Sequence, residues 1–480
     1  MSKRRCLSAD GPQDAPQGVP PLEVRGERGS YVSEAAFAAL KSRRLSITIT
    51  MMVLIHLWAA SASAGALTLG EGIREAVEKS RLVKMSLADE SIAGDEALID
   101  RARLLPSVNA EANGTALAYQ PGAVFGTVSV PTAERNFIAY SLSVQQLVYD
   151  FRGSSSRYEA TREKVNSRKF DTKRIRNLAA IDFALAFFDL LESERMVMVA
   201  GREVERLEAH SRDAASMYEA GVITKNDLLQ AEVRLSDSRQ RRLQTENLRS
   251  VNASRVNNAL QRPLGTDVQA VDLREEDLAG LSEAVRGLPL EKAWETAEKK
   301  RAELLIVDSA LKSLDFEERA KKAEYYPRIF AQGGVDYADN RYQVHETNWS
   351  LILGVRVNLF SGGSTAADVA RTVHQRDRAR EDRRRIVEGI RLEVERYVLE
   401  ARSARDRVAV TRNSMQQADE NLRINRVRYS EGVGTATEVL DAVTLLTVAE
   451  TNYYRAVYDL GKYSIAVFYA IGEDLTEVYR

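Results

Sequence analysis

Two carboxylates near the C-terminal end, Glu438 and Asp441, have the spacing that most directly suggests chemistry. They are three positions apart, so in a helix both side chains project from the same face. Carboxylates gathered at a constriction attract cations and raise each other's pKa. Acidic residues also begin many ordinary helices, because they interact favourably with the helix dipole. The spacing therefore leaves a cation-selecting site and a plain helix start as alternatives.

The remaining reactive side chains do not form the pattern of an enzyme site. The histidines lack the spacing of metal ligands; they are His56, His210, His345 and His374. Gly362-Gly363 is not accompanied by the Lys-Ser/Thr of a phosphate-binding loop. The single cysteine, Cys6, lies in a segment that we expect to be removed, so the mature chain has no thiolate nucleophile. We expect no enzymatic activity, no metal site and no cofactor.

The composition favours long helices over a nucleic-acid-binding domain. Basic residues number 68 and acidic residues 69, so the chain lacks the basic excess of a general nucleic-acid binder. Only 10 residues are proline and 29% are charged, which is typical of helices with solvated faces. Arginine runs such as Arg383-Arg384-Arg385 are more often solvated helix surface than ligand sites.

An export signal is predicted near the N-terminus. Lys41, Arg43 and Arg44 precede an apolar run at 45–60, and a stretch of small residues follows at 61–66. This order is that of a cleaved signal peptide, and no lipid-anchoring cysteine follows it. A membrane anchor is the alternative, but the run is shorter than the roughly 20 apolar residues that span a bilayer. We assign residues 1–64 to a leader and signal peptide.

The rest of the chain contains an internal repeat, because three motifs recur in the same order. The pairs are Arg103-Leu-Leu-Pro106 with Glu324-Tyr-Tyr-Pro327, Tyr149-Asp-Phe-Arg-Gly-Ser154 with Asn358-Leu-Phe-Ser-Gly-Gly363, and Tyr218-Glu-Ala-Gly-Val-Ile-Thr224 with Tyr429-Ser-Glu-Gly-Val-Gly-Thr435. We place the first repeat at 65–287 and the second at 288–480.

Each repeat is expected to contribute two β-strands. Four segments alternate apolar and polar residues; they are 108–112, 138–144, 329–337 and 349–359. Polar loops are expected between them at 120–135 and 339–348. Such strands separate oil from water in a membrane barrel, although a half-buried soluble sheet shows the same alternation. No mature segment is apolar enough for a spanning helix, so membrane insertion would require these strands.

Very long helices are predicted after each pair of strands. Residues 154–220 and 364–430 contain no proline and almost no glycine, and their apolar residues follow three- and four-residue steps. After a glycine-containing turn, a second helix returns from Asn226 to about Gln261, and another from Glu438 to about Tyr469. The expected fold class is α+β, with four strands continued by long helical hairpins. A strand hairpin leaves bare edges, so we expect the chain to assemble.

Over residues 67–472 the chain resembles the TolC family of outer-membrane efflux proteins. The paired strand-entry, strand-exit and turn motifs carry this resemblance, and the most specific is the segment from Tyr429 to Asp441. The resemblance implies a homotrimer whose chains each give four strands to one twelve-stranded outer-membrane β-barrel. It implies a long α-helical barrel across the periplasm, with a ring of shorter segments drawn from 263–287 and the C-terminus. The implied partners are a periplasmic adaptor (membrane fusion protein), an inner-membrane pump and outer-membrane lipid.

The resemblance also implies roles at the two helical turns, which close the periplasmic mouth in the family. Glu438 and Asp441 correspond to carboxylates that ring the constriction. Asp227 and Tyr429 correspond to an acid and a tyrosine that form a helix latch, meaning contacts that hold adjacent helices together. The family arginine of this latch falls on Gly434, which argues against a charged latch here.

The turn residues are expected to meet the adaptor. They are Gly221, Val222, Thr224, Gly432, Val433 and Thr435. The glycines among them are also what a tight helix-to-helix turn requires. The expected function is an outer-membrane exit duct of a trans-envelope efflux or type I secretion system. The alternative is an exported coiled-coil scaffold or surface adhesion protein without channel activity, which accounts for the helices but not for the paired strands.

Overall fold

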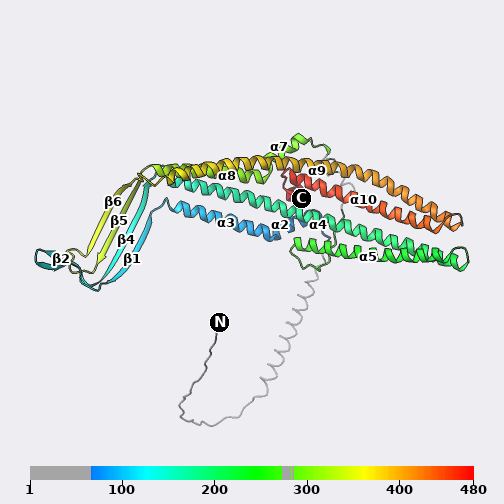
Figure 1. Ribbon diagram of the computed structural model, residues 1–480, viewed down its shortest axis with the longest axis horizontal. Helices are drawn as coiled ribbons and strands as arrows, with labels where there is room; N and C mark the ends of the chain where they lie inside the picture. The colour runs from blue at the N-terminus through cyan, green and yellow to red at the C-terminus, as the bar shows by residue number, and fades with distance from the viewer. Residues whose placement is uncertain (1–65, 273–279, 281–282, 284–285, 480) are drawn as a thin grey trace, which may run out of the picture. The chain divides into compact units, whose positions relative to one another are not determined.

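The computed structural model describes residues 66–272, 280, 283 and 286–479 (Figure 1). The predicted leader and signal peptide at 1–64 lie outside these residues. Two helical regions, separated by strands, make up most of the described chain. The first contains α2 (Leu69–Lys79), α3 (Arg81–Ala102), α4 (Gly153–Glu219) and α5 (Lys225–Ala259). The second contains α7 (Leu290–Lys300), α8 (Ala302–Lys322), the 3-10 turn η1 (Ala323–Tyr325), α9 (Ser364–Ser430), α10 (Ala436–Ala470) and α11 (Leu475–Val478).

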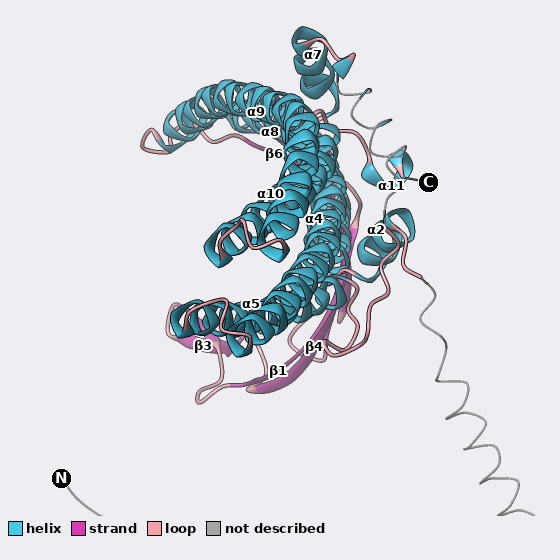
Figure 2. Ribbon diagram, turned by 90° about the vertical axis from the view of Figure 1, so that its right-hand side faces the viewer, coloured by secondary structure: helices cyan, strands magenta, loops and turns pink. Residues whose placement is uncertain are grey.

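The long helices occur in two pairs of equal length. Helices α4 and α9 each have 67 residues, and α5 and α10 each have 35. Helix α4 packs against α5, α3, α8 and α10, while α9 packs against α10 and α8. Figure 2 shows α10 between α9 and α4. At 1.5 Å per residue, a 67-residue helix is about 100 Å long. None of the described helices is long and apolar enough to cross a membrane.

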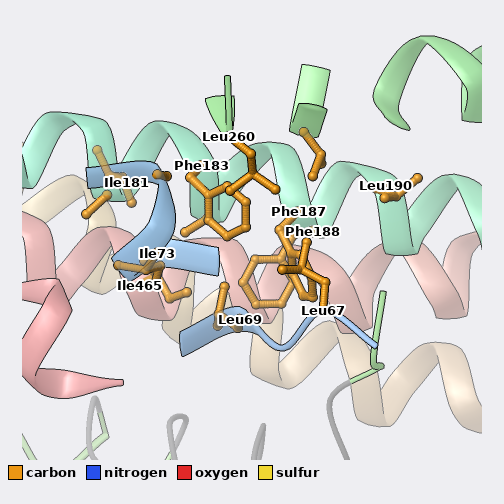
Figure 3. Close-up of a cluster of buried hydrophobic side chains, with 14 of the residues drawn as sticks. Leu67, Leu69, Ile73, Ile181, Phe183, Phe187, Phe188, Leu190, Leu260 and Ile465 are labelled. Carbon is orange, nitrogen blue, oxygen red and sulfur yellow. The ribbon is translucent and has the colours of Figure 1, made fainter. Parts of the chain in front are cut away.

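The largest hydrophobic core lies where α4 meets α2, α5 and α10. Phe183, Phe187 and Phe188 of α4 are fully buried there (Figure 3). Their positions differ by one, four and five residues, so they fall on one helix face. A Cβ at Gly72 of α2 would overlap the Phe183 ring, and one at Gly461 of α10 would overlap the Phe188 ring. Glycine at these two positions therefore allows α2 and α10 to approach α4 closely.

The sheet has four antiparallel strands in the order β1-β4-β5-β6. Its strands are β1 (Ser107–Ala116), β4 (Asn136–Tyr149), β5 (Arg328–Ala338) and β6 (Thr347–Arg356). The four alternating segments therefore do form strands, two of them within residues 65–287 and two within residues 288–480. Strands β1 and β6 are the edges of this sheet.

Two details of the predicted strands were wrong. The expected polar loop at 120–135 contains a hairpin of β2 (Gly122–Phe125) and β3 (Val128–Pro131), which closes through Gly126 at φ +63°. The last strand was expected to reach Leu359 but ends at Arg356. Its partner β5 begins opposite at Arg328, directly after Pro327, which has no backbone N–H to donate.

The register places most of the apolar residues of the four strands on one face. Directly opposed pairs on this face include Leu142 with Val335, and Tyr140 with Tyr337, whose rings stack at 6.1 Å. The side chain of Trp349 on the same face is 75% exposed, so no described element covers it. Polar residues occupy the opposite face, where Asp336 opposes Asn348. The sheet therefore has one uncovered apolar face and one polar face.

Candidate functional site

Two turns of matching construction end the long helix pairs. We call residues 220–224, between α4 and α5, the first tip, and residues 431–435, between α9 and α10, the second tip. Gly221 and Gly432 have φ values of +74° and +72°, a region that favours glycine. Thr224 begins α5 and Thr435 begins α10, and each accepts a hydrogen bond from the backbone N–H three residues later. The sequence folds this way because glycine ends one helix and threonine starts the next.

The predicted adaptor-facing residues lie at the protein surface. The Val222 side chain is 65% exposed and that of Val433 is 69% exposed. Gly221, Thr224, Gly432 and Thr435 are also exposed. Each tip thus presents an uncovered valine within a rigid, capped turn.

Gly434 lies in a tight space at the second tip. An added Cβ would come within 3.0 Å of the Tyr429 backbone nitrogen and 3.1 Å of the Arg428 carbonyl carbon. A longer side chain at this position would therefore require the turn to shift. A different arginine supplies positive charge here, because Nη1 of Arg428 lies 3.7 Å from Oε1 of Glu438. Arg428 was not among the predicted site residues, although it lies directly before Tyr429 at the start of the tip motif.

The acidic residues predicted for the gate and the latch begin helices in this chain. Oδ2 of Asp227 accepts a hydrogen bond from the Thr224 backbone N–H at 3.1 Å. Oε2 of Glu438 likewise accepts one from the Thr435 N–H at 2.9 Å. Asp441 is exposed one turn further along α10. Asp227 and Glu438 thus have the helix-starting role, and the gate and latch roles remain predictions.

Tyr429 lies in a buried contact between the two helix pairs. Its side chain is 5% exposed, and its ring centre lies 5.1 Å from that of His210 on α4, which is 4% exposed. Neither the Tyr429 hydroxyl nor His210 Nε2 has a hydrogen-bond partner among the described residues. A cavity of about 450 Å³ adjoins them, and Asp213 and Arg426 line it. His210 could have been found from its spacing, because it continues the buried stripe of α4 that includes Leu207 and Ala214.

Burial determines the electrostatics of this contact. It raises the pKa of Tyr429, and the negative charges of Asp227 and Asp213 raise it further. Burial lowers the pKa of His210; Asp213 opposes this effect and Arg426 adds to it. Both groups are therefore neutral at pH 7. In the part of the chain that the structure describes, the Tyr429 hydroxyl makes no hydrogen bond to Asp227, whose negative charge acts only on the pKa of the tyrosine.

Ion pairs with buried carboxylates connect the helices next to this contact. Glu450 of α10 is 5% exposed and accepts two hydrogen bonds from Arg206 of α4, both at 2.8 Å. Glu203 of α4 accepts one from Arg241 of α5 at 2.7 Å. Two-point contacts between arginine and carboxylate fix geometry as well as contributing energy. The α4–α10 and α4–α5 contacts are therefore held in register about 20–25 Å from the tips.

The comparisons with known proteins agree with this architecture. A family model described as outer membrane efflux protein matches residues 295–473, which include β5, β6, α9, α10 and the second tip. The alkaline protease secretion protein AprF of Pseudomonas aeruginosa is 23% identical over 420 residues, covering 82% of each chain. The second half of the chain thus has the sequence pattern of outer membrane efflux proteins, and most of the chain is similar to AprF. A second relative, the outer membrane efflux protein BepC of Brucella suis, is 20% identical and aligns with 69% of this chain and 71% of its own.

Solved structures show the same fold as this chain. A structure of CusC superposes with a TM-score of 0.73 at 17% identity, covering 84% of this chain and 92% of CusC. The open state of the Neisseria gonorrhoeae MtrE outer membrane channel gives 0.68 at 18% identity, covering 85% and 89%. The Campylobacter jejuni CmeC outer membrane channel gives 0.72 at 14% identity, covering 84% and 85%. The strands, long helices and tips thus share their arrangement with known channels.

Proposed function

We propose that this protein is an outer-membrane exit duct, which takes substrate from an inner-membrane pump and periplasmic adaptor and releases it outside the cell. The observation that carries this function is the sheet. One of its faces is apolar and uncovered, and its strands β4 and β6 lead within a few residues into the 67-residue helices α4 and α9. A protein with this pair of features can place strands in lipid while its helices extend into water.

Aromatic residues at the helix end of the sheet support a position in the membrane. The rings of Tyr149 and Phe151 lie 4.9 Å apart, and those of Phe151 and Tyr326 also 4.9 Å apart. Tyr149 opposes Ile329 on the apolar face. Aromatic side chains with a polar tip are enriched where a bilayer meets water. This cluster would mark the periplasmic boundary of the membrane.

Assembly is required because β1 and β6 are edge strands. Four strands are too few for a membrane barrel, and exposed edges in lipid leave unpaired backbone groups. A homotrimer that joins the β6 edge of each copy to the β1 edge of the next would give twelve strands in a closed ring. The matching lengths of α4 with α9 and of α5 with α10 support the two repeats at 65–287 and 288–480.

The tips are the proposed docking surface for the adaptor and the proposed gate. Their exposed valines, Val222 and Val433, would meet the adaptor. Glu438 and Asp441 would set the charge of the constriction, and Asp227 and Tyr429 would hold the helices closed. An exported scaffold would not need the uncovered apolar face of the sheet, so we favour the duct. The similarity to AprF, a secretion protein by name, makes protein secretion the first transport activity to test.

The duct can be tested with purified protein in detergent and in planar bilayers. The complex should have the mass of three chains, and single molecules should open conductances that scale with salt concentration. A monodisperse monomer, or a trimer that inserts without conducting, would contradict the proposal. Mass spectrometry of the same sample should find an unlipidated N-terminus near residue 65, which tests the export signal separately.

A further inference from the structure

Two arginines oppose each other on the polar face of the sheet, at its helix end. Arg328 of β5 and Arg356 of β6 are direct partners in the antiparallel register. Directly opposed side chains have Cβ atoms about 5 Å apart, and like charges at this spacing are destabilising. A guanidinium group does not lose its proton in proteins, so deprotonation cannot relieve the repulsion. Neither arginine has an ion-pair partner among the residues that the structure describes. This arrangement is unfavourable unless an anion lies nearby.

A third arginine joins this pair around one cavity. The cavity has a volume of about 550 Å³, and Arg103 lines it together with Arg328 and Arg356. The carboxylate of Asp100 lies 3.4 Å from Nε of Arg103, and it also accepts a hydrogen bond from Thr161. One carboxylate therefore stands near three permanent cations. The cavity keeps an excess of positive charge.

The same cavity has an apolar wall. Leu147 of β4 opposes Phe330 of β5, and both side chains line the cavity. The Phe330 ring lies across Gly354, where a Cβ would overlap it. The Arg356 guanidinium lies 5.3 Å from the centre of this ring. Glycine at 354 thus allows the ring to lie flat beside the arginine, so that an apolar surface and a cation adjoin.

The positive charge is confined to one end of the polar face. Glu111 and Asp336 lie on this face, both opposite Ser141 of β4. Eight residues separate Arg328 from Asp336, which is about 26 Å along a strand. The carboxylates are therefore too distant to neutralise the arginines, since charges in water are screened beyond about 8–10 Å. The helix end of this face is basic, whereas the opposite end is acidic.

We propose that Arg103, Arg328 and Arg356 form a binding site for an anionic solute with an apolar body. A carboxylate, phosphate or sulfonate group would accept hydrogen bonds from the guanidinium groups, which match such anions in geometry. The apolar body would pack against Leu147 and Phe330. If the polar face lines the duct proposed above, this site lies where substrate passes from the helices to the strands and selects anionic substrates there. The binding itself does not depend on that assumption.

Fluorescence anisotropy can test the site with 5-carboxyfluorescein, an aromatic anion, and the detergent-purified full chain. We expect saturable binding that weakens as KCl is raised, and at least tenfold weaker binding by the double variant Arg328→Gln/Arg356→Gln. The matched control is Arg384→Gln/Arg385→Gln on α9, where each arginine has a carboxylate partner three residues away, and it should bind the dye like the parent. Rhodamine 6G, a cationic aromatic dye, should not bind at this site. Equal loss of dye binding in both double variants, equal binding of both dyes, or no saturable binding by the parent would overturn the proposal.

Planar-bilayer recordings separate this site from the proposed duct. The double variant Arg328→Gln/Arg356→Gln should still insert and conduct. Its reversal potential in a KCl gradient should shift in the direction of greater cation selectivity. A parent protein that conducts but does not bind the dye would disprove the proposed anion site but not the proposed duct. A parent protein that binds the dye but does not conduct would disprove the proposed duct but not the proposed anion site. Thermal unfolding of both double variants should match the parent, so that a loss of dye binding reports on the arginines.

Discussion

Placing an arginine on each face of β6 tests which side of the sheet contacts lipid. Leu351 and Ile352 are neighbours of similar size that point to opposite faces, Leu351 opposite Gly333 and Ile352 opposite Gln332. The Leu351 side chain is 75% exposed and that of Ile352 is 49% exposed. Neither substitution therefore has to disrupt a packed core. Leu351→Arg changes the apolar face, and Ile352→Arg is its matched control on the polar face.

The expected cost follows from the depth of Leu351 in the membrane. It lies five residues from Arg356 at the helix end of the strand, which is about 16 Å along the strand. A strand tilt of roughly 40° reduces this to about 12 Å of height, half of an apolar band about 25 Å tall. Leu351 is thus near the bilayer centre, where an arginine facing lipid costs about 2–4 kcal/mol per chain. Ile352→Arg should cost less than about 1 kcal/mol, because its charge remains in water.

The assay is the amount of folded protein in the outer-membrane fraction, measured by the mobility of unheated and heated samples on a gel. Leu351→Arg should reduce the folded fraction severely, since 2–4 kcal/mol corresponds to a factor of roughly 30 to 1,000 in an equilibrium. Ile352→Arg should stay within about twofold of the parent. Equal effects of the two substitutions, or a larger effect of Ile352→Arg, would refute the assignment of the apolar face to lipid.

Three further predictions concern the core, the buried histidine and the tips. Gly461→Ala should destabilise the protein by about 1–3 kcal/mol, because the added Cβ overlaps a buried ring. Gly389→Ala has open space around its Cβ and should stabilise the protein by up to about 1 kcal/mol. Thermal unfolding of both variants should therefore show changes of opposite sign. Burial lowers the pKa of His210, so protonation favours the unfolded state, and stability should fall as pH drops through the ordinary histidine pKa of about 6.5. The melting temperature should therefore fall more between pH 7.5 and pH 5.5 for the parent than for His210→Asn. An equal fall in both proteins would contradict this. Replacing Glu438 and Asp441 by Ala should lower cation selectivity, measured as the reversal potential in a KCl gradient; an unchanged potential would remove these residues from the constriction.

The long helices and their turns could be predicted because few residue types end a helix. Gly221 and Gly432 allow the positive φ of the turns, and Thr224 and Thr435 start the returning helices. These local signals place both tips within two residues. The strands were also predictable, because period-two alternation distinguishes them from the helices.

The β2–β3 hairpin and the arginine pair could not be predicted in the same way. The hairpin is four residues on each strand, too short for alternation to rise above the composition of a polar loop. Arg328 and Arg356 belong to different strands, and only the register makes them neighbours. Pairing between distant segments is a property of the folded chain, so single-segment patterns do not contain it.

The candidate site was predictable in position but not in contacts. The tip motifs located Tyr429 and Glu438 correctly at the ends of the helices. Sequence spacing did not indicate that the Tyr429 ring would meet His210, because that contact joins α4 to α9 across more than 200 positions. Nor did it indicate that Arg428 would lie beside Glu438 in place of an arginine at 434.

The uninterrupted length of α4 restricts how this chain can evolve. Each inserted residue would advance the first tip by about 1.5 Å and rotate it by about 100° relative to the strands. A single insertion would therefore turn the Phe183 face away from α2 and α10 and misalign the tips. Insertions of seven residues restore the face to within about 20°, and they preserve matched ends only when α9 lengthens equally. Changes in the length of α4 are thus expected in multiples of seven residues, each accompanied by an equal change in the length of α9.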